Sequence, residues 1–458
     1  MNLGMLKLFR FLFIFILLQN LHANSSDLNF KLIKKGIQDE NTLLIVGGIQ
    51  GDEPGGFMAA SLIATHYEIT KGSVWIVPNL NFNSIIQRSR GPFGDMNRKF
   101  AYISEEDPDY IDVKRIKELI KKPEVKLILN LHDGSGYFRN KYIDKDHSPY
   151  KWGQSSIIDQ SSLNVPAYGN LEEIGKRICK KVNESLIREE DIYHLHNTKT
   201  KLGDKEMEKT LTYYAINNGK AAFGNEASKE LPVHERTYYH LLALEEYMNI
   251  MGIEFKRKFD LEPIALRNVI DNDIYISFYN DKIKLPLSEV RSYIGYFPVK
   301  KDGTIDFKPS SPVMTVIKNS NSTYAIHYGN RRLSVLEPDY LEVSEKKENI
   351  KFKIDGEDKN IEIGSLVDVG KSFYVFPNEY RVNVIGYVNK NFRNESGLNI
   401  EKDDIIKRFS LDRKGEIYRV EFYNKIDNKF AGMVLVKFSK KFYEELVSNE
   451  VGKVPPSL

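Results

Sequence analysis

The chain has 458 residues, enough for roughly two to four domains of ordinary size. Hydrophobic residues make up 41% and charged residues 28%, a balance that is typical of a globular protein and excludes a disordered one. The formal net charge is only +3, which is not the strongly basic footprint of a nucleic-acid-binding protein, so we expect no nucleic-acid partner.

The N-terminal residues 1–23 have the pattern of a cleaved signal peptide. Lys7 and Arg10 precede the apolar run 11–18, and Ala23 is a small residue at a plausible cleavage point. The apolar run is much shorter than the ~20 residues that span a bilayer, and no later segment is apolar enough to do so. We therefore expect an exported protein that has no transmembrane segment once the signal peptide is removed.

Strands alternate with helices in residues 24–252. Runs of apolar and β-branched residues indicate the strands, and apolar residues at helical spacing indicate the helices between them. Such alternation favours an α/β domain with a mixed, mostly parallel sheet that helices cover on both faces. The single cysteine, Cys179, lies in one of these helices and is expected in the core, so no internal disulfide can form. The predicted strands are 42–46, 73–78, 125–131 and 220–223, and the predicted helices are 57–67, 112–122, 171–188 and 233–251.

The pattern changes after about Gly252. Short alternating or β-branched runs follow, separated by turn residues, and no long helical pattern occurs. We predict that this half consists of all-β modules, with a small β domain over 253–343 and an immunoglobulin-like β-sandwich over 344–458. The charged stretch 344–348 would join them.

Polar residues follow several of the predicted strands. Gln50 and Glu53 lie in the glycine-rich turn 47–56 after the first strand, His132 follows the third strand, and Glu226 follows the last. Ligands of open α/β sheets bind at the carboxyl ends of the strands. We therefore expect these side chains to meet at one edge of the sheet.

A second polar group lies on the loop after strand 73–78 and contains Arg88, Arg90, Asn97 and Arg98. Arg98 can bind a carboxylate bidentately, with Asn97 beside it. A fixed cation such as Arg90 would stabilise an oxyanion as its charge develops. Arg88 and Arg90 could exchange roles, and their spacing leaves this choice open.

These groups suit metal-assisted hydrolysis. A catalytic zinc keeps three protein ligands and an open position for water, and Gln50, Glu53 and His132 would supply them to one zinc per chain. Zinc lowers the pKa of a bound water to about 7, and Glu226 would accept the water's proton and deliver it to the leaving amine. Beside a carboxylate clamp, this set is typical of a carboxypeptidase.

The same residues resemble the zinc carboxypeptidase (M14) family over roughly residues 40–250. Two positions depart from the family pattern, because Gln50 stands where the first ligand is normally histidine, and an Asn-Leu-Asn turn replaces N-P-x-G. The motifs H-x-x-E, N-P-x-G, R, N-R-x-F, H and E correspond to 50–53, 78–81, Arg90, 97–100, His132 and Glu226.

The glutamine, the signal peptide and the two β modules resemble a narrower group, the periplasmic murein DL-carboxypeptidases that set helical cell shape. This resemblance implies a carboxypeptidase-like fold and a zinc enzyme that removes meso-diaminopimelate from peptidoglycan tripeptides, leaving the L-Ala-D-Glu dipeptide. The β modules are then candidates for contacts with the wall or with protein partners. The site residues that it implies are the zinc ligands Gln50, Glu53 and His132, the general base Glu226, and the substrate-binding residues Arg90, Asn97, Arg98 and Trp152.

Two other functions stay open at this point. The run 47–53 also resembles the turn of succinylglutamate desuccinylase and aspartoacylase relatives, but those deacylases are usually cytoplasmic and lack β appendages. A non-catalytic wall-binding protein with a decayed zinc site is the second alternative, although such a protein would not need Glu226 as a base. His194 and His196 have no third ligand at suitable spacing and are expected at the surface.

Overall fold

The computed structural model describes residues 28–346, 348–388 and 393–439, and the expected signal peptide lies outside them. The chain divides into two compact units. The first unit runs up to Asp271 and also includes Ser311–Thr315 and His327–Arg331, and the second unit contains the other described residues. Within the described part of the chain, no helix is both long and apolar enough to cross a membrane.

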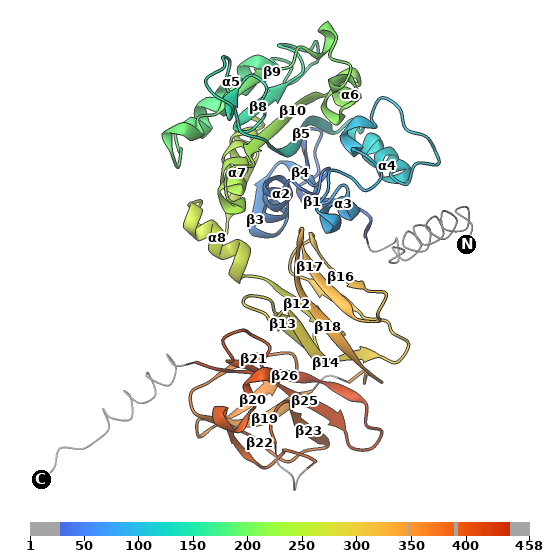
Figure 1. The fold of residues 1–458 in the computed structure, drawn as a ribbon, viewed down its shortest axis with the longest axis vertical. Helices are drawn as coiled ribbons and strands as arrows, with labels where there is room; N and C mark the ends of the chain where they lie inside the picture. The colour runs from blue at the N-terminus through green and yellow to red at the C-terminus, as the bar shows by residue number, and fades with distance from the viewer. Residues whose placement is uncertain (1–27, 347, 389–392, 440–458) are drawn as a thin grey trace, which may run out of the picture. The chain divides into compact units, whose positions relative to one another are not determined.

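A seven-stranded sheet forms the centre of the first unit, in the spatial order β1 (Ile33–Gly36), β4 (Ser73–Val77), β2 (Thr42–Val46), β5 (Val125–Gly134), β10 (Ala221–Ser228), β8 (Ser155–Ile158) and β9 (His194–Asn197) (Figure 1). The strands β4, β2, β5 and β10 are parallel, whereas β1 and β8 run antiparallel to their neighbours β4 and β10. All five residues of β2 are buried, as expected for a central strand that is covered on both faces. The predicted mixed, mostly parallel sheet is confirmed.

Helices lie on both sides of this sheet (Figure 1). On one side α7 (Val233–Ile250) packs against α2 (Pro54–His66) and α5 (Leu171–Asn183), and Cys179 of α5 is buried as predicted. On the other side α4 (Tyr110–Ile120) and α6 (Leu211–Asn217) contact β5. The unit also contains α3 (Phe82–Gln87), β3 (Tyr67–Lys71), β6 (Tyr137–Phe138), β7 (His147–Ser148), β11 (Glu254–Arg257) and the short 3-10 helices η2 (Met96–Arg98), η3 (Glu189–Asp191), η4 (Thr200–Leu202) and η5 (Met207–Lys209).

The glycines of the turn 47–56 allow close backbone approach around α2. A Cβ on Gly51 would lie 1.9 Å from the backbone oxygen of Ser84, and a Cβ on Gly56 would lie 2.8 Å from that of Leu131. Since both neighbours are backbone atoms, a side chain at Gly51 would push the turn away from α3, and a side chain at Gly56 would push it away from β5. The two glycines therefore let the turn pack closely against α3 and β5.

One helix, α8 (Pro263–Asn272), lies in a stretch that the sequence pattern indicated as all-β. Leu266 and Ile270 are buried and lie one turn apart, and Pro263 occupies the first helical position, which it favours. Two buried residues give too weak a periodicity for this helix to be predicted from the sequence.

Beyond α8, the described residues form four β-sheets. The last two sheets share one core, which includes Phe352, Phe373 and Phe422, and so form a β-sandwich. The four sheets, in spatial order, are β13 (Ile283–Pro286), β12 (Tyr275–Phe278) and β15 (Phe307–Pro309); β14 (Tyr293–Lys300), β18 (Arg331–Leu341), β17 (Tyr324–Tyr328) and β16 (Met314–Lys318); β20 (Glu357–Glu362), β19 (Asn349–Ile354), β22 (Ser372–Val375) and β24 (Asn399–Glu401); and β21 (Leu366–Val369), β26 (Phe430–Phe438), β25 (Ile417–Asn424) and β23 (Tyr380–Val384). Two short 3-10 helices, η6 (Lys402–Asp404) and η7 (Lys407–Phe409), follow β24.

A buried arginine ties the sandwich to the strands that precede it. Arg419 of β25 is 2% exposed, and its Nη1 and Nη2 donate hydrogen bonds to the backbone oxygens of Tyr296 and Gly295 at 2.9 and 3.0 Å. Both acceptors belong to β14, which lies in the stretch predicted as a separate small domain. These strands and the sandwich belong to the same compact unit.

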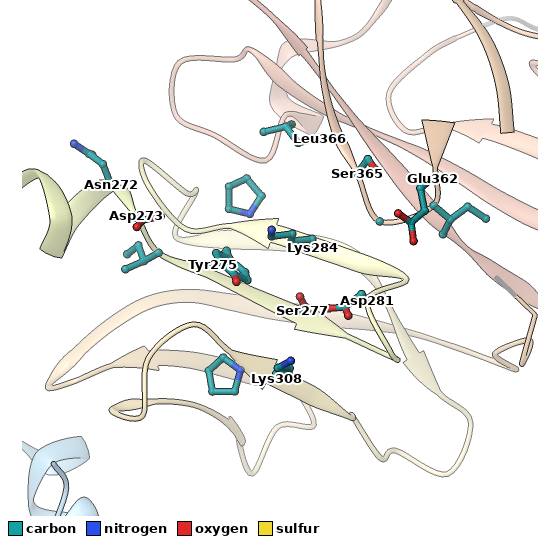
Figure 2. Close-up of a pocket in the computed structure, with 15 residues that line it drawn as sticks. Asn272, Asp273, Tyr275, Ser277, Asp281, Lys284, Lys308, Glu362, Ser365 and Leu366 are labelled. Carbon is teal, nitrogen blue, oxygen red and sulfur yellow. The ribbon is translucent and has the colours of Figure 1, made fainter. Parts of the chain in front are cut away.

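A cavity of about 700 Å³ lies within this second unit (Figure 2). Tyr275, Lys284 and Lys308 line it from β12, β13 and β15, and the turn Glu362–Leu366 lines it from the sandwich. Nζ of Lys284 lies 4.1 Å from the centre of the Tyr275 ring, so the ammonium group covers a face of this ring. None of the residues predicted to carry chemistry lies here.

Candidate metal centre and active site

β5 and β10 place His132 and Glu226 side by side. The two strands are parallel neighbours, and Glu226 is the register partner of His132. The sequence pattern predicted that these strands end before the two residues, whereas the strands continue to Gly134 and Ser228. Because the two residues are register partners, the sheet itself fixes their imidazole and carboxylate on one face.

Gln50, Glu53 and His132 converge on one point. Nδ1 of His132 lies 3.2 Å from Oε1 of Gln50 and 2.8 Å from Oε2 of Glu53. The three residues are 2%, 4% and 7% exposed, so their surroundings hold each of them in place. Within the described residues, no group of three His, Cys, Asp or Glu side chains could hold a metal. An amide oxygen, a carboxylate and an imidazole fit zinc.

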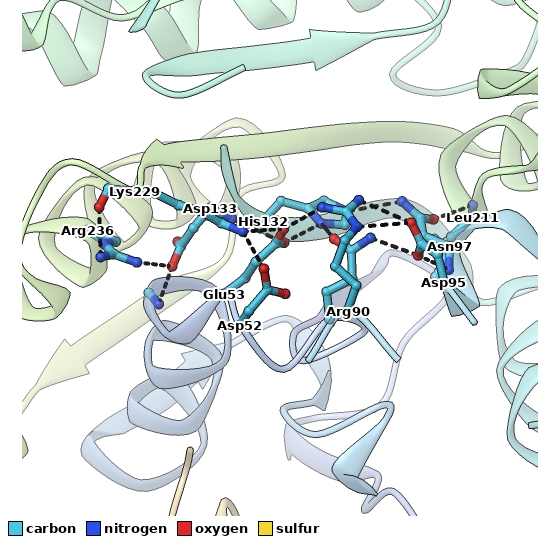
Figure 3. A network of polar contacts seen from close by, with 12 residues as sticks. Asp52, Glu53, Arg90, Asp95, Asn97, His132, Asp133, Leu211, Lys229 and Arg236 are labelled. Atoms are coloured by element: carbon cyan, nitrogen blue, oxygen red, sulfur yellow. Dashed lines mark hydrogen bonds and ion pairs between the residues drawn. The ribbon is translucent and has the colours of Figure 1, made fainter. Parts of the chain in front are cut away.

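Asp95 orients the amide of Gln50, a role that was not predicted from the sequence. Oδ1 of Asp95 accepts a hydrogen bond from Nε2 of Gln50 at 2.8 Å. Since a carboxylate only accepts, the NH₂ group must face Asp95, and the amide oxygen is left to face His132. Asp95 also accepts from Nη2 of Arg90 at 3.1 Å and from the backbone N–H of Asn97 at 2.9 Å (Figure 3). Its position two residues before Asn97, where it caps η2, is the sequence signal that could have indicated it.

The structure places Arg90, and not Arg88, beside the candidate ligands. Nη1 of Arg90 lies 3.5 Å from Oε1 of Glu53. Arg88 ends α3 in the left-handed region with φ of 54°, and its Nε donates to the backbone oxygen of Asn330. The choice that the sequence left open therefore falls on Arg90 as the cation at this site.

Asn97 and Arg98 present hydrogen-bond donors to the same site. Oδ1 of Asn97 accepts from the backbone N–H of Leu211 at 3.0 Å, so its NH₂ group faces inward, 3.4 Å from Nε2 of His132. The side chain of Arg98 is 30% exposed, with its Nε 3.6 Å from Glu206. An inward amide donor and a half-buried guanidinium can together bind a carboxylate.

Glu226 is half-buried, and one oxygen of its carboxylate is fully buried. Its Oε2 has no hydrogen-bonding partner among the described residues. Burial, together with the negative charges of Glu53 and Asp133, raises the pKa of Glu226 to about 8. Burial alone would lower the pKa of His132, but its hydrogen bond to Glu53 and the charges of Glu53 and Glu226 outweigh burial and raise it. A buried carboxylate whose pKa lies near neutral pH suits general acid–base catalysis.

A buried network on the opposite face of the sheet joins β5 to β10. His240 of α7 is fully buried, and its Nε2 donates to Oδ1 of Asp133 at 3.2 Å because a carboxylate can only accept. Its Nδ1 then accepts from Nδ2 of Asn225 at 2.9 Å. Asp133 also accepts from the backbone N–H of Gly55 at 2.8 Å. Since Asp133 and Asn225 are the chain neighbours of the candidate ligand and base, the network fixes the strand ends that carry them.

A cavity of about 200 Å³ opens beside these groups. Lys229, which no sequence signal indicated, also lines it, with its Nζ 2.6 Å from Oδ2 of Asp52 and 3.4 Å from Oε1 of Glu53. The structure brings all the predicted site residues together around this cavity: Gln50, Glu53, Arg90, Asn97, Arg98, His132, Trp152 and Glu226.

His194 and His196 belong to neither the metal centre nor the open surface. The ring of His196 stacks on Phe138 with the centroids 3.9 Å apart, and it lies 4.9 Å from the Trp152 ring. Burial lowers the pKa of His196 to about 4, so the ring is neutral. The expected surface position is wrong for His196, because its ring supports the Trp152 wall of the cavity. His194 is half-buried, with its ring edge-on to Phe138.

An amide oxygen, a carboxylate and an imidazole that converge beside a second carboxylate and two arginines are the arrangement expected of a metallo-carboxypeptidase. The comparisons with known proteins agree. Residues 6–271 match the family described as "Carboxypeptidase controlling helical cell shape catalytic" (peptidase M99), and residues 343–439 match "C-terminal domain of metallo-carboxypeptidase". The first match covers more than half of the chain, so this chain belongs to that family of metallo-carboxypeptidases.

Solved structures of one bacterial protein are similar over most of the chain. The apo form of the cell shape determinant protein Csd4 from Helicobacter pylori is 40% identical, with a TM-score of 0.80 and coverage of 90% of this chain and 100% of that one. A tripeptide-bound structure of the same protein gives the same values. Its mDAP-bound form, described as a D,L-carboxypeptidase, is 41% identical, with a TM-score of 0.80 and coverage of 89% and 100%. A search among curated sequences found no match.

The family match confirms the enzyme class predicted from the sequence. It favours a carboxypeptidase over both alternatives that the sequence left open, the deacylase and the non-catalytic wall-binding protein.

Proposed function

We propose that this chain is an exported zinc D,L-carboxypeptidase of the cell wall. It hydrolyses the bond between D-Glu and meso-diaminopimelate in peptidoglycan tripeptides, leaves the dipeptide, and thereby trims the wall that sets helical cell shape. The convergence of Gln50, Glu53 and His132 beside Glu226 carries the proposal. The tripeptide-bound and mDAP-bound relatives support the substrate, and the signal-peptide pattern of residues 1–23 supports a periplasmic location.

One zinc per chain would be held by Oε1 of Gln50, Oε2 of Glu53 and Nδ1 of His132, the atoms that converge. Zinc would supply Lewis-acid activation of the attacking water and of the scissile carbonyl group. Asp95 matters here because it keeps the amide oxygen of Gln50, and not its NH₂ group, on the ligand side. An amide oxygen is a weaker donor than imidazole, so we expect lower zinc affinity than at a site with two histidines.

Glu226 moves the proton during hydrolysis. As the water oxygen bonds to the carbonyl carbon, the water proton passes to the Glu226 carboxylate. When the C–N bond breaks, Glu226 returns the proton to the amine of the departing diaminopimelate. Burial raises the pKa of Glu226 to about 8. A cation held by Gln50, Glu53 and His132 would favour the ionised carboxylate and lower this pKa, so Glu226 can both accept and donate a proton near neutral pH. Arg90 stabilises the oxyanion.

The remaining residues hold the peptide. Asn97 and Arg98 bind the free carboxylate of the C-terminal residue, and Trp152 forms one wall of the cavity. Lys229 adds a third cation to Arg90 and Arg98. Several cations suit a stem peptide that carries several free carboxylates.

Product analysis tests this function. Zinc-loaded protein is incubated with muropeptide tripeptides and tetrapeptides, and the products are identified by mass. We expect free diaminopimelate and dipeptide from the tripeptide, and a loss of at least about a hundredfold in rate for Glu226→Gln. Glu230→Gln, at an exposed glutamate four residues further on, should keep the activity. Metal-replete protein that releases no product from any muropeptide would refute the proposal.

A further inference from the structure

The floor of the active-site cavity carries a buried amide without a partner. Asn130 is 0% exposed, and neither its Oδ1 nor its Nδ2 has a hydrogen-bonding partner among the described residues. The residue nevertheless lines the same cavity as His132 and Glu226. An unpaired buried amide opposes folding, because its hydrogen bonds to water are lost without replacement. Such a group calls for a polar partner that arrives with the substrate.

Strand geometry places Asn130 one row beneath the catalytic groups. It precedes His132 by two residues on β5, so both side chains lie on the same face of the sheet. Its register partner on β10 is Gly224, two residues before Glu226. A Cβ on Gly224 would lie only 3.0 Å from Cβ of Ile157. The glycine therefore allows Ile157 to pack closely against β10, and both residues line the cavity together with Asn130.

We propose that Asn130 recognises the distal end of the side chain of the released residue, an inference that rests on the proposed function. The side chain of meso-diaminopimelate ends in a carbon that carries both an ammonium group and a carboxylate. Oδ1 of Asn130 accepts from the ammonium group and Nδ2 donates to the carboxylate. Asn97 and Arg98 bind the other carboxylate of the same residue, so the cavity binds the two ends of diaminopimelate at separate points. A lysine side chain offers only an ammonium group, which bonds to Oδ1 and leaves Nδ2 without a partner. An apolar side chain bonds to neither atom.

Asn225 is a matched asparagine whose amide serves the fold. It is 1% exposed and lies on the neighbouring strand, with its side chain on the opposite face of the sheet. Its Nδ2 donates to Nδ1 of His240 at 2.9 Å and to the hydroxyl of Tyr193 at 3.3 Å, whereas its Oδ1 has no partner among the described residues. The fold therefore uses the donors of Asn225, whereas it uses neither the donors nor the acceptor of Asn130, which remain for a ligand.

Kinetics with three tripeptides tests the proposal. The peptides differ only in their last residue, which is meso-diaminopimelate, L-lysine or L-norleucine. Wild type should prefer them in that order, and Asn130→Leu should lower kcat/KM for the diaminopimelate peptide about 10- to 100-fold while changing the norleucine peptide less than about threefold. Equal losses on all three peptides would overturn the role of Asn130 and leave the proposed function standing. A wild type that cleaves none of them would overturn both.

Two further measurements do not depend on turnover. In thermal unfolding of the metal-free protein, Asn130→Leu should raise the Tm, because it removes an unpaired amide, and Asn225→Leu should lower it. A lowered Tm for Asn130→Leu would show that the amide serves the fold and would overturn the proposal. Free meso-diaminopimelate should also bind zinc-loaded wild type at least about tenfold more tightly than free L-norleucine does, and equal affinities would contradict the inference.

Discussion

Replacing Glu226 by glutamine should stabilise the metal-free protein at alkaline pH. The pKa of this carboxyl lies at about 8 in the fold, against an ordinary value of 4.5, so the folded state binds more protons than the unfolded state between these values. Stability contributed by the protonated group is therefore complete below about pH 4.5 and is lost as the pH rises toward 8. By pH 9 the ionised group costs the folded state about 5 kcal/mol, a cost that glutamine does not carry.

Tryptophan fluorescence provides a direct assay, because both tryptophans of the chain, Trp75 and Trp152, lie in the first unit. We expect wild type and Glu226→Gln to unfold at similar temperatures at pH 5. At pH 9 the metal-free variant should unfold roughly 10 °C higher, from ~2–4 °C per kcal/mol for a unit of this size. If both proteins lose the same stability between pH 5 and pH 9, the carboxyl does not titrate as described and its assignment as a perturbed acid is refuted.

Three further outcomes follow from the site. Gln50→His should retain zinc or bind it more tightly, since imidazole is the better donor, and weaker binding in a zinc titration would contradict the ligand assignment. Asp95→Ala should weaken zinc about 10- to 100-fold by freeing the Gln50 amide to turn, and unchanged affinity would show that Asp95 does not orient it. Arg90→Ala should lower kcat about 10²- to 10³-fold, whereas Arg88→Ala should leave it nearly unchanged, and the reverse result would exchange their roles.

The order of strands and helices in the first unit could be predicted because its central strands are almost wholly apolar. The apolar run TLLIV in β2 indicates a central strand, because only a strand covered on both faces of the sheet buries every residue of such a run. The ends of β5 and β10 could not be predicted, because polar residues such as Asp133 and Asn225 look like loop residues in the sequence. They are buried in the strands, where His240, far away in the chain, pairs with both of them.

The candidate site was predictable where its residues lie close together in the sequence. Gln50 and Glu53 are three residues apart on one turn, and Asn97 and Arg98 are adjacent, so the sequence alone brings each pair together. The function of Asn130 was not visible, because only the packing of two strands shows that its amide is buried without a partner. Spacing also could not separate Arg88 from Arg90, since the left-handed backbone at Arg88 decides where that side chain points.

The central claim is that one zinc ion is held by an amide oxygen, a carboxylate and an imidazole. Crystals of the zinc-loaded protein, measured on both sides of the zinc absorption edge, test it most directly. We predict a single anomalous peak in the first unit, bonded to Oε1 of Gln50, a carboxylate oxygen of Glu53 and Nδ1 of His132, with zinc–oxygen and zinc–nitrogen distances of about 2.0–2.2 Å. A zinc ion that lies elsewhere, or that Gln50 does not touch, would contradict the account.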